Sequence, residues 1–276
     1  MTREFSVTGP IEVRATLRSA DLLITPGEPG VVTVLLESSR DAAERGAFAA
    51  NSVVELVGDV LYIDAQLPRF FARGRSRIHV TLPTGCALHA ETGSGDVTCL
   101  TALPRATVRT GSGDIELTEV DELRYAAGSG DLRMASVRTA RAQSGSGDLR
   151  IQRVLESLSS RTGSGDLVLG TATDVEAASG SGDISIEELH GASTLRSASG
   201  DVTVRRAVSG RLETRTASGD VHVGVASGTA ALLDCSTVSG RLRSELAGSE
   251  APGPDEARLE LIARTTSGNL TISRAG

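Results

Sequence analysis

The stretch TGSGDV at residues 92–97 recurs as TGSGDI at residues 110–115 and as TGSGDL at residues 162–167. The Ser-Gly-Asp triplet inside it ends at eight aspartates that follow one another at intervals of 17 to 19 residues. A fixed period of this kind is typical of repeat architectures, in which each unit stacks on its neighbours. The eight residues are Asp96, Asp114, Asp131, Asp148, Asp166, Asp183, Asp201 and Asp220.

The residues after each aspartate alternate as those of a half-buried strand do. The first and third positions are apolar in every repeat, as in Ile115 and Leu117, whereas the position between them is mostly polar, as in Glu116. Successive side chains of a strand point to opposite faces, so the apolar positions face a core. A second strand, apolar inside and rich in arginine outside, precedes each turn.

These repeats predict an all-β fold, a single-stranded parallel β-helix (β-solenoid) with coils of 17–19 residues. A unit this short cannot bury its own apolar face, and stacking at strand spacing, roughly 4.8 Å per coil, builds a continuous core. A narrow aliphatic interior also explains why aromatic residues make up only 2% of the chain. Right-handed coiling is expected, as for other parallel crossovers. An antiparallel meander of hairpins is the alternative, although it would not need the same corner in every repeat.

At the corner itself, the sequence predicts turn chemistry. Glycine tolerates positive φ, and an aspartate side chain accepts hydrogen bonds from nearby backbone N–H groups in an Asx-type turn. We therefore interpret the eight aspartates as a structural turn ladder, without catalytic, cofactor-binding or metal-binding residues.

The chain divides by pattern into degenerate N-terminal coils at 1–89, regular repeats at 90–225 and degenerate C-terminal coils at 226–276. In the first region Asp21 and Asp59 resemble coil corners, each about two coils from the next. A serine N-cap and an alanine-rich stretch predict a short helical insertion at 39–51.

The C-terminal region contains two further turns of the same type, at Ser239-Gly240-Arg241 and at Ser267-Gly268-Asn269. A proline-containing polar stretch at 248–256 predicts an exposed loop between them. We expect residues 265–272 to form the last coil.

Composition excludes some functions. The chain carries a formal charge of −7, has no lysine, and contains few aromatic side chains, which disfavours nucleic-acid binding. An odd number of cysteines, Cys86, Cys99 and Cys235, suits a reducing compartment. Since neither a signal peptide nor a membrane-spanning apolar run is recognisable, we expect a cytoplasmic protein without a membrane partner.

The recurring Thr/Ser-Gly-Ser-Gly-Asp-aliphatic-x-aliphatic unit resembles the bacterial DUF4097 family of β-strand repeat proteins. Residues 9–13 (GPIEV) and residues 80–83 (VTLP) add to the resemblance, which covers nearly the whole chain. The resemblance implies a parallel β-helix. It also implies an adhesin-like role, since family members are labelled adhesins after surface-located relatives, but this chain departs from those relatives in lacking an export signal.

Two other chemistries compete with turn chemistry as explanations of the repeats. Stacked aspartates in glycine-rich turns resemble calcium-binding β-rolls, but those repeat every nine or so residues with two such turns per coil. A polysaccharide-cleaving enzyme needs paired carboxylates, and the adjacent pairs Asp121-Glu122 and Glu187-Glu188 are better explained as solvated surface residues. The four histidines have no ligand spacing; they are His79, His89, His190 and His222.

The sequence thus favours a non-enzymatic scaffold or protein-interaction module without a cofactor. The partner is an unknown protein or a further copy of the chain, reached through the solenoid ends, because terminal strands carry unpaired backbone groups. A surface adhesin-like module is the alternative, and a carbohydrate-active enzyme is the third interpretation.

Overall fold

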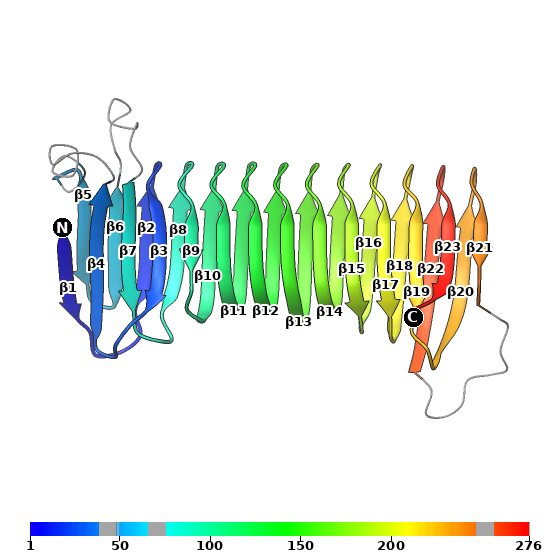
Figure 1. The fold of residues 1–276 in the computed structure, drawn as a ribbon, viewed down its shortest axis with the longest axis horizontal. Coiled ribbons are helices and arrows are strands. Elements are labelled where there is room, and N and C mark those ends of the chain that lie inside the picture. Colours follow the sequence, from blue (N-terminus) through cyan, green and yellow to red (C-terminus); the bar gives the residue numbers. More distant parts are fainter. Residues whose placement is uncertain (39–47, 49, 66–75, 247–256, 276) are drawn as a thin grey trace. The chain divides into compact units, whose positions relative to one another are not determined.

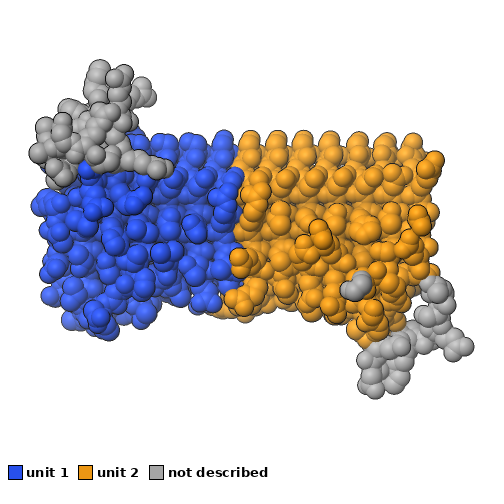
Figure 2. All heavy atoms as spheres, in the orientation of Figure 1, with its two compact units in different colours: residues 1–137 blue, residues 138–276 orange. Residues whose placement is uncertain are grey.

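The computed structural model describes residues 1–38, 48, 50–65, 76–246 and 257–275 (Figure 1). They form 23 strands, most of them paired in parallel. The chain splits into two compact units, unit 1 (residues 1–137) and unit 2 (residues 138–276), which Figure 2 colours separately. Within the described residues, helical structure is confined to Phe48 and Ala50, and no helix is long and apolar enough to cross a bilayer.

The strands of unit 1 are β1 (Thr2–Ser6), β2 (Glu12–Leu17), β3 (Asp21–Pro26), β4 (Val31–Ser38), β5 (Ser52–Val57), β6 (Val60–Ala65), β7 (Ser76–Leu82), β8 (Ala87–Thr92), β9 (Val97–Cys99), β10 (Leu103–Thr110) and β11 (Ile115–Ala127). Strand β12 (Leu132–Ser144) begins in unit 1 and ends in unit 2.

The strands of unit 2 are β13 (Leu149–Thr162), β14 (Leu167–Ser179), β15 (Ile184–Leu189), β16 (Ala192–Ser197), β17 (Val202–Ala207), β18 (Gly210–Thr216), β19 (Val221–Val225), β20 (Thr229–Thr237), β21 (Leu242–Ser244), β22 (Ala257–Thr265) and β23 (Leu270–Arg274).

Two stacks of parallel strands build the core of unit 1. One stack runs β6, β2, β8, β10, β11, and the other runs β7, β3, β9, β11. Equivalent residues of successive coils lie side by side, as Val108 does between Ala90 and Tyr125. The predicted β-solenoid is thereby confirmed, and the antiparallel meander is wrong for the repeats. Its right-handedness stays a prediction.

The coils of unit 1 do not stack in chain order. Strand β2 pairs with both β6 and β8, and β3 pairs with both β7 and β9, so the β2–β3 coil lies between strands that follow it in sequence. The corner at Asp21 is therefore the direct neighbour of the corner at Asp96, not separated from it by several coils as the spacing suggested. Asp59 is no coil corner, because Gly58, with φ of 60°, turns the antiparallel β5–β6 hairpin there.

In unit 2 as well, the coils do not stack in chain order. Strands β18 and β19 pair with β22 and β23, and these pair in turn with β20 and β21. The segment at 265–272, predicted as the last coil, is last in the chain but second to last in the stack. Strands β20 and β21 are the outermost of unit 2 (Figure 1).

Two predicted features fall largely outside the described residues. Of the helical insertion at 39–51, the structure describes only residues 48, 50 and 51. The predicted loop at 248–256 lies wholly outside them.

The turn glycines are required by close stacking rather than by positive φ. Positive φ occurs at Gly30, Gly58, Gly85, Gly210 and Gly228, none of which belongs to a Ser-Gly-Asp corner, so that part of the expectation is wrong. A Cβ added to Gly113 would instead fall against the carbonyl oxygen of Gly95 one coil earlier, far inside van der Waals contact. The same contact recurs in unit 2 between Gly182 and Gly165.

A hydroxyl group closes the corner from within in coils of both units, as at Thr110 and Thr216. The Thr110 hydroxyl accepts the N–H of Gly113 at 2.8 Å and donates to the Gly113 carbonyl at 3.1 Å. Where the equivalent residue is Ala127, the hydroxyl of Tyr125, two residues upstream, donates to the Gly130 carbonyl at 2.7 Å. Burial, followed by the nearby Asp131 and Asp114 carboxylates, raises the pKa of Tyr125 far above its ordinary value, so the hydroxyl stays a donor.

Replacing the turn glycine should therefore be costly. We expect Gly113→Ala to lower the free energy of unfolding by roughly 3 kcal/mol, because the neighbouring backbone must move. Urea denaturation measures the loss. Gly9→Ala is the matched control, since no atom lies within 4 Å of its Cβ position, and an equal effect of the two changes would contradict the stacking explanation.

Tyr125 supplies the hydroxyl that a corner threonine supplies in other coils, so a threonine at position 127 should compensate for its loss. Tyr125→Phe leaves the buried Gly130 carbonyl without this donor and should cost about 1–2 kcal/mol. Adding Ala127→Thr restores the hydroxyl found in neighbouring coils and should recover most of the loss. Thermal and urea melts of both variants test this, and a double variant no more stable than Tyr125→Phe alone would refute it.

Candidate interaction surface

The predicted aspartates join successive coils through their side chains. In unit 1 the Oδ1 of Asp96 accepts the backbone N–H of Asp114 at 2.9 Å, and the Oδ1 of Asp114 accepts that of Asp131 at 3.1 Å. The bond therefore runs between coils, whereas the sequence suggested an Asx turn within one corner. Each carboxylate thus binds the backbone of the next corner.

The ladder in unit 2 contains the same bond at every step. The Oδ1 atoms of Asp148, Asp166, Asp183 and Asp201 accept the N–H groups of Asp166, Asp183, Asp201 and Asp220 at 2.8 to 3.0 Å. Beyond them, Asp220 accepts the N–H of Asn269 at 2.7 Å, and the Asn269 amide oxygen accepts the N–H of Arg241 at 3.1 Å. Arg241 has no side-chain acceptor, so the ladder ends with it.

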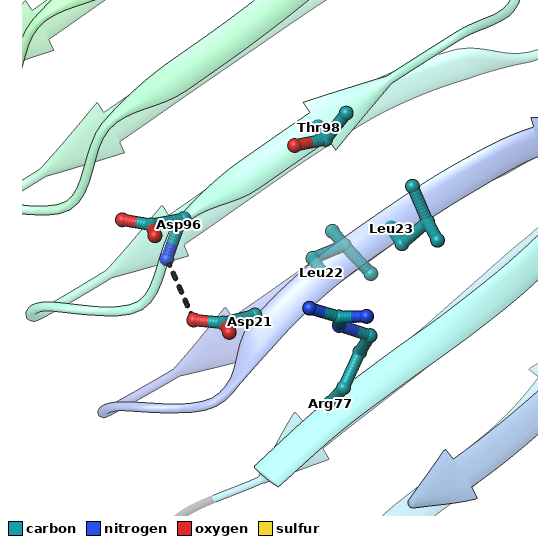
Figure 3. Close-up of a pocket in the computed structure, with 6 residues that line it drawn as sticks. All are labelled: Asp21, Leu22, Leu23, Arg77, Asp96 and Thr98. Carbon is teal, nitrogen blue, oxygen red and sulfur yellow. Dashed lines mark hydrogen bonds between the residues drawn. The ribbon is translucent and has the colours of Figure 1, made fainter. Parts of the chain in front are cut away.

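An arginine lies beside Asp21, whose carboxylate binds the corner at Asp96. Arg77 occupies the position beside Asp21 in the strand register, and together with Leu22, Leu23, Asp96 and Thr98 these residues line a small pocket (Figure 3). The Asp96 N–H donates to Asp21 Oδ1 across it at 3.2 Å. The pocket is thus lined by one guanidinium and two carboxylates, and one of those carboxylates already accepts a backbone N–H.

Ion pairs and hydrogen bonds involve most of the other predicted candidates. Glu187 and Glu188 contact Arg205 and Arg206 at 3.2 and 3.6 Å, and Glu122 contacts Arg105 at 3.2 Å. These carboxylates lie on exposed strand faces rather than around a common cleft. In the described part of the chain, no three or more His, Cys, Asp or Glu side chains are grouped so as to hold a metal ion.

The histidines and cysteines do not converge either. His79 contacts the Thr25 hydroxyl at 2.8 Å, His190 contacts Glu188 at 2.6 Å, and His89 contacts Glu91 at 3.5 Å. The three cysteines are free thiols. Burial raises the pKa of Cys99 to about 11, which keeps it a neutral thiol at physiological pH.

The outermost strands of unit 2 leave the solenoid core uncovered by any described residue. Leu242 is in register with Leu270, yet its exposed fraction is 50% against 1% for Leu270. Leu233 is likewise half-buried beside the fully buried Leu261. Strands β20 and β21 each pair on one side only among the described strands, with β22 and β23. We call the surface formed by β20, the turn at 238–241 and residues 242–246 the open edge.

Among the described residues, the outermost strands of unit 1 expose less of the core. Its outermost stacks end in antiparallel strands, β4 and β1 on β7 and β5 on β6. Inward residues of β5 and β4 are covered, since Val54 and Val34 have exposed fractions of 1% and 0%. On the outer strand β1, the inward Phe5 is half-buried. The aromatic ring of Phe48 is also buried there, at 1%.

The exposed end of the unit 2 stack is formed by β20 and β21, not by the coil at 265–272 that the sequence predicts as the last. The signal that marks it is Arg241, an arginine in the position that aspartate or asparagine occupies in neighbouring corners. That substitution indicates where the ladder stops, irrespective of chain order.

A family comparison identifies the fold independently. The chain belongs to the family described as Toastrack DUF4097, whose model matches residues 18–274, which confirms the resemblance noted from the repeats. No protein with a curated description matches it.

Solved structures with similarity to the chain come from bacteria. A putative adhesin from Bacteroides fragilis is 14% identical with a TM-score of 0.38, and 99% of this chain and 96% of that one are covered. A putative lipid binding protein from Parabacteroides distasonis is 15% identical with a TM-score of 0.44, and the covered shares are 98% and 96%. At these values neither structure bears on the ligand or partner of this chain.

The aspartate ladder predicts a distinction between two substitutions. Asp114→Ala removes the acceptor for the Asp131 N–H and should cost about 1 kcal/mol, whereas Asp114→Asn keeps an acceptor oxygen, as Asn269 does, and should be nearly neutral. Calcium should leave the melting temperature of the unaltered chain unchanged relative to an ionic-strength control. A calcium-dependent rise that Asp114→Asn abolishes would instead indicate a metal site.

Proposed function

We propose that this DUF4097 protein is a non-enzymatic β-solenoid module that binds a polypeptide through the open edge of unit 2. The observation that supports this most directly is the 50% exposure of Leu242, a residue of a column that is buried in neighbouring coils. An uncovered core beside strands with free backbone groups is the surface to which an added strand binds.

Backbone pairing would provide most of the affinity. A strand that docks along β20 or β21 satisfies N–H and C=O groups that point away from β22 and β23, and it covers Leu233 and Leu242. Burying such side chains contributes roughly 25 cal/mol per Å² of apolar area removed from water. Recognition of this kind selects an extended, partly apolar segment.

The charges of the open edge are balanced. Arg243 pairs with Glu245 at 3.1 Å, and Asp234 pairs with Arg264 of the adjacent strand at 3.2 Å. A strongly basic or acidic partner would gain little here, which disfavours nucleic acid and an anionic membrane as occupants.

An enzymatic function has little support. The paired carboxylates suggested by sequence lie in surface ion pairs, and no described aromatic row accompanies them. We also retain a cytoplasmic location as part of the proposal, because three free thiols suit a reducing compartment.

Site-specific photo-crosslinking in the native cells tests the proposal. A photoreactive amino acid at position 238, where the valine is 83% exposed, should yield an adduct with a polypeptide. The same probe at position 155 of β13, where the leucine is 56% exposed but lies away from the open edge, is the control. If position 238 gives no polypeptide adduct, or the same adducts as position 155, the proposed binding edge is wrong.

A further inference from the structure

We infer that the polypeptide bound by the open edge is a second copy of this chain, joined to the first by antiparallel strand pairing about a twofold axis. This inference rests on the proposed function, since it names the partner of the same surface. Its two supports are the end of the aspartate ladder and the order of charges around Ser244.

The end of the ladder disfavours parallel continuation. Each further coil of this solenoid donates a corner N–H to the side-chain oxygen of the preceding corner, as Arg241 does to Asn269. The next corner in a parallel stack would meet the Arg241 side chain, which offers no acceptor. An antiparallel partner places its own corner at the opposite end of β20. Its corner N–H therefore needs no acceptor from Arg241. Unit 1 already contains such a parallel-to-antiparallel change, where β4 pairs with β7.

The order of charges around Ser244, the last residue of β21, is complementary to itself. Arg243 and Glu245 flank Ser244, with exposed side-chain fractions of 74% and 50%. Antiparallel pairing centred on Ser244 sets Arg243 of each copy opposite Glu245 of the other, and sets Leu242 opposite Leu246. Cross-strand pairs of opposite charge and of apolar side chains stabilise a sheet.

The same twofold axis relates the second strand of the coil, β20, to its copy. Thr237 and Leu242 flank the turn at 238–241, so Cys235, two residues before Thr237, lies level with Ser244, two residues after Leu242. An axis through Ser244 therefore passes near Cys235. Both β20 and β21 can therefore pair with their own copies at once. Leu233 and Leu242 then lose the exposure that sets them apart from their buried neighbours.

The assembly should stop at two chains. An isologous contact uses the same surface of both copies and therefore closes on itself. One coil end measures about 30 Å by 10 Å, so its area is well below the ~800 Å² that each partner buries in a standard interface. We therefore expect a dimer that forms at micromolar concentrations and dissociates on dilution.

Charge reversal within the full-length chain tests the inference. By sedimentation equilibrium, the unaltered chain should show a monomer–dimer equilibrium without larger species. Arg243→Glu should weaken dimerisation about tenfold, and so should Glu245→Arg, because like charges then face each other. The double variant Arg243→Glu/Glu245→Arg should restore it. The matched control is Arg211→Glu, which disrupts a comparable exposed pair with Glu260 inside the stack and should leave dimerisation unchanged.

A crosslink measures the geometry separately. A short thiol-reactive bismaleimide should join two chains through Cys235, since Cys86 and Cys99 are buried, and Cys235→Ser should abolish the product. The inference is overturned if the chain stays monomeric at several hundred micromolar, if it polymerises, or if a dimer forms that charge reversal does not weaken and that the bismaleimide does not join through Cys235. If a monomeric chain still yields an adduct with a different protein from position 238, the proposed function stands and only the identity of the partner is wrong.

Discussion

The structure depends on one constraint, the close approach of successive backbones at the corner of each coil. Strands that stack at roughly 4.8 Å bring the corner of one coil against the carbonyl oxygen of the previous corner. Only a residue without a Cβ fits between them, which is why Gly113 and Gly182 recur at the same position. With the corner fixed, the aspartate oxygen of one coil lies within hydrogen-bonding distance of the next N–H group, and the aliphatic columns come into register.

Much of this was predictable from the sequence because the constraint acts locally. Period, strand alternation and the apolar columns each depend on residues within one coil, so Ile115, Leu117 and their equivalents could be assigned to a core without coordinates. The sequence could not reveal why the corner residues are glycines or in which direction the aspartate hydrogen bonds run, because both depend on a neighbouring coil. Corner composition alone does not distinguish a contact between coils from an unusual φ value.

The order in which the coils stack could not be predicted from the sequence either. Every coil presents the same two edges, so a coil fits wherever its corner and columns match, and chain order imposes little. Asp21 therefore lies beside Asp96 although 75 residues separate them. The candidate interaction surface was missed for the same reason: its residues belong to strands β20 and β21, which are outermost in the stack but not last in the chain. Arg241 was visible in the sequence, yet its meaning as the end of a ladder emerges only with the bonds around it.

The insertion of the β2–β3 coil between later strands, and of the β22–β23 coil inside β20–β21, has a consequence for how the chain reaches its fold. Residues 12–26 cannot occupy their final place until residues 60–99 exist to hold them on both sides, so unit 1 cannot grow coil by coil from the ribosome. In return, both inserted coils are paired on two sides. Terminal stretches usually fray first, but these two coils are held on both sides, so unfolding must begin outside them.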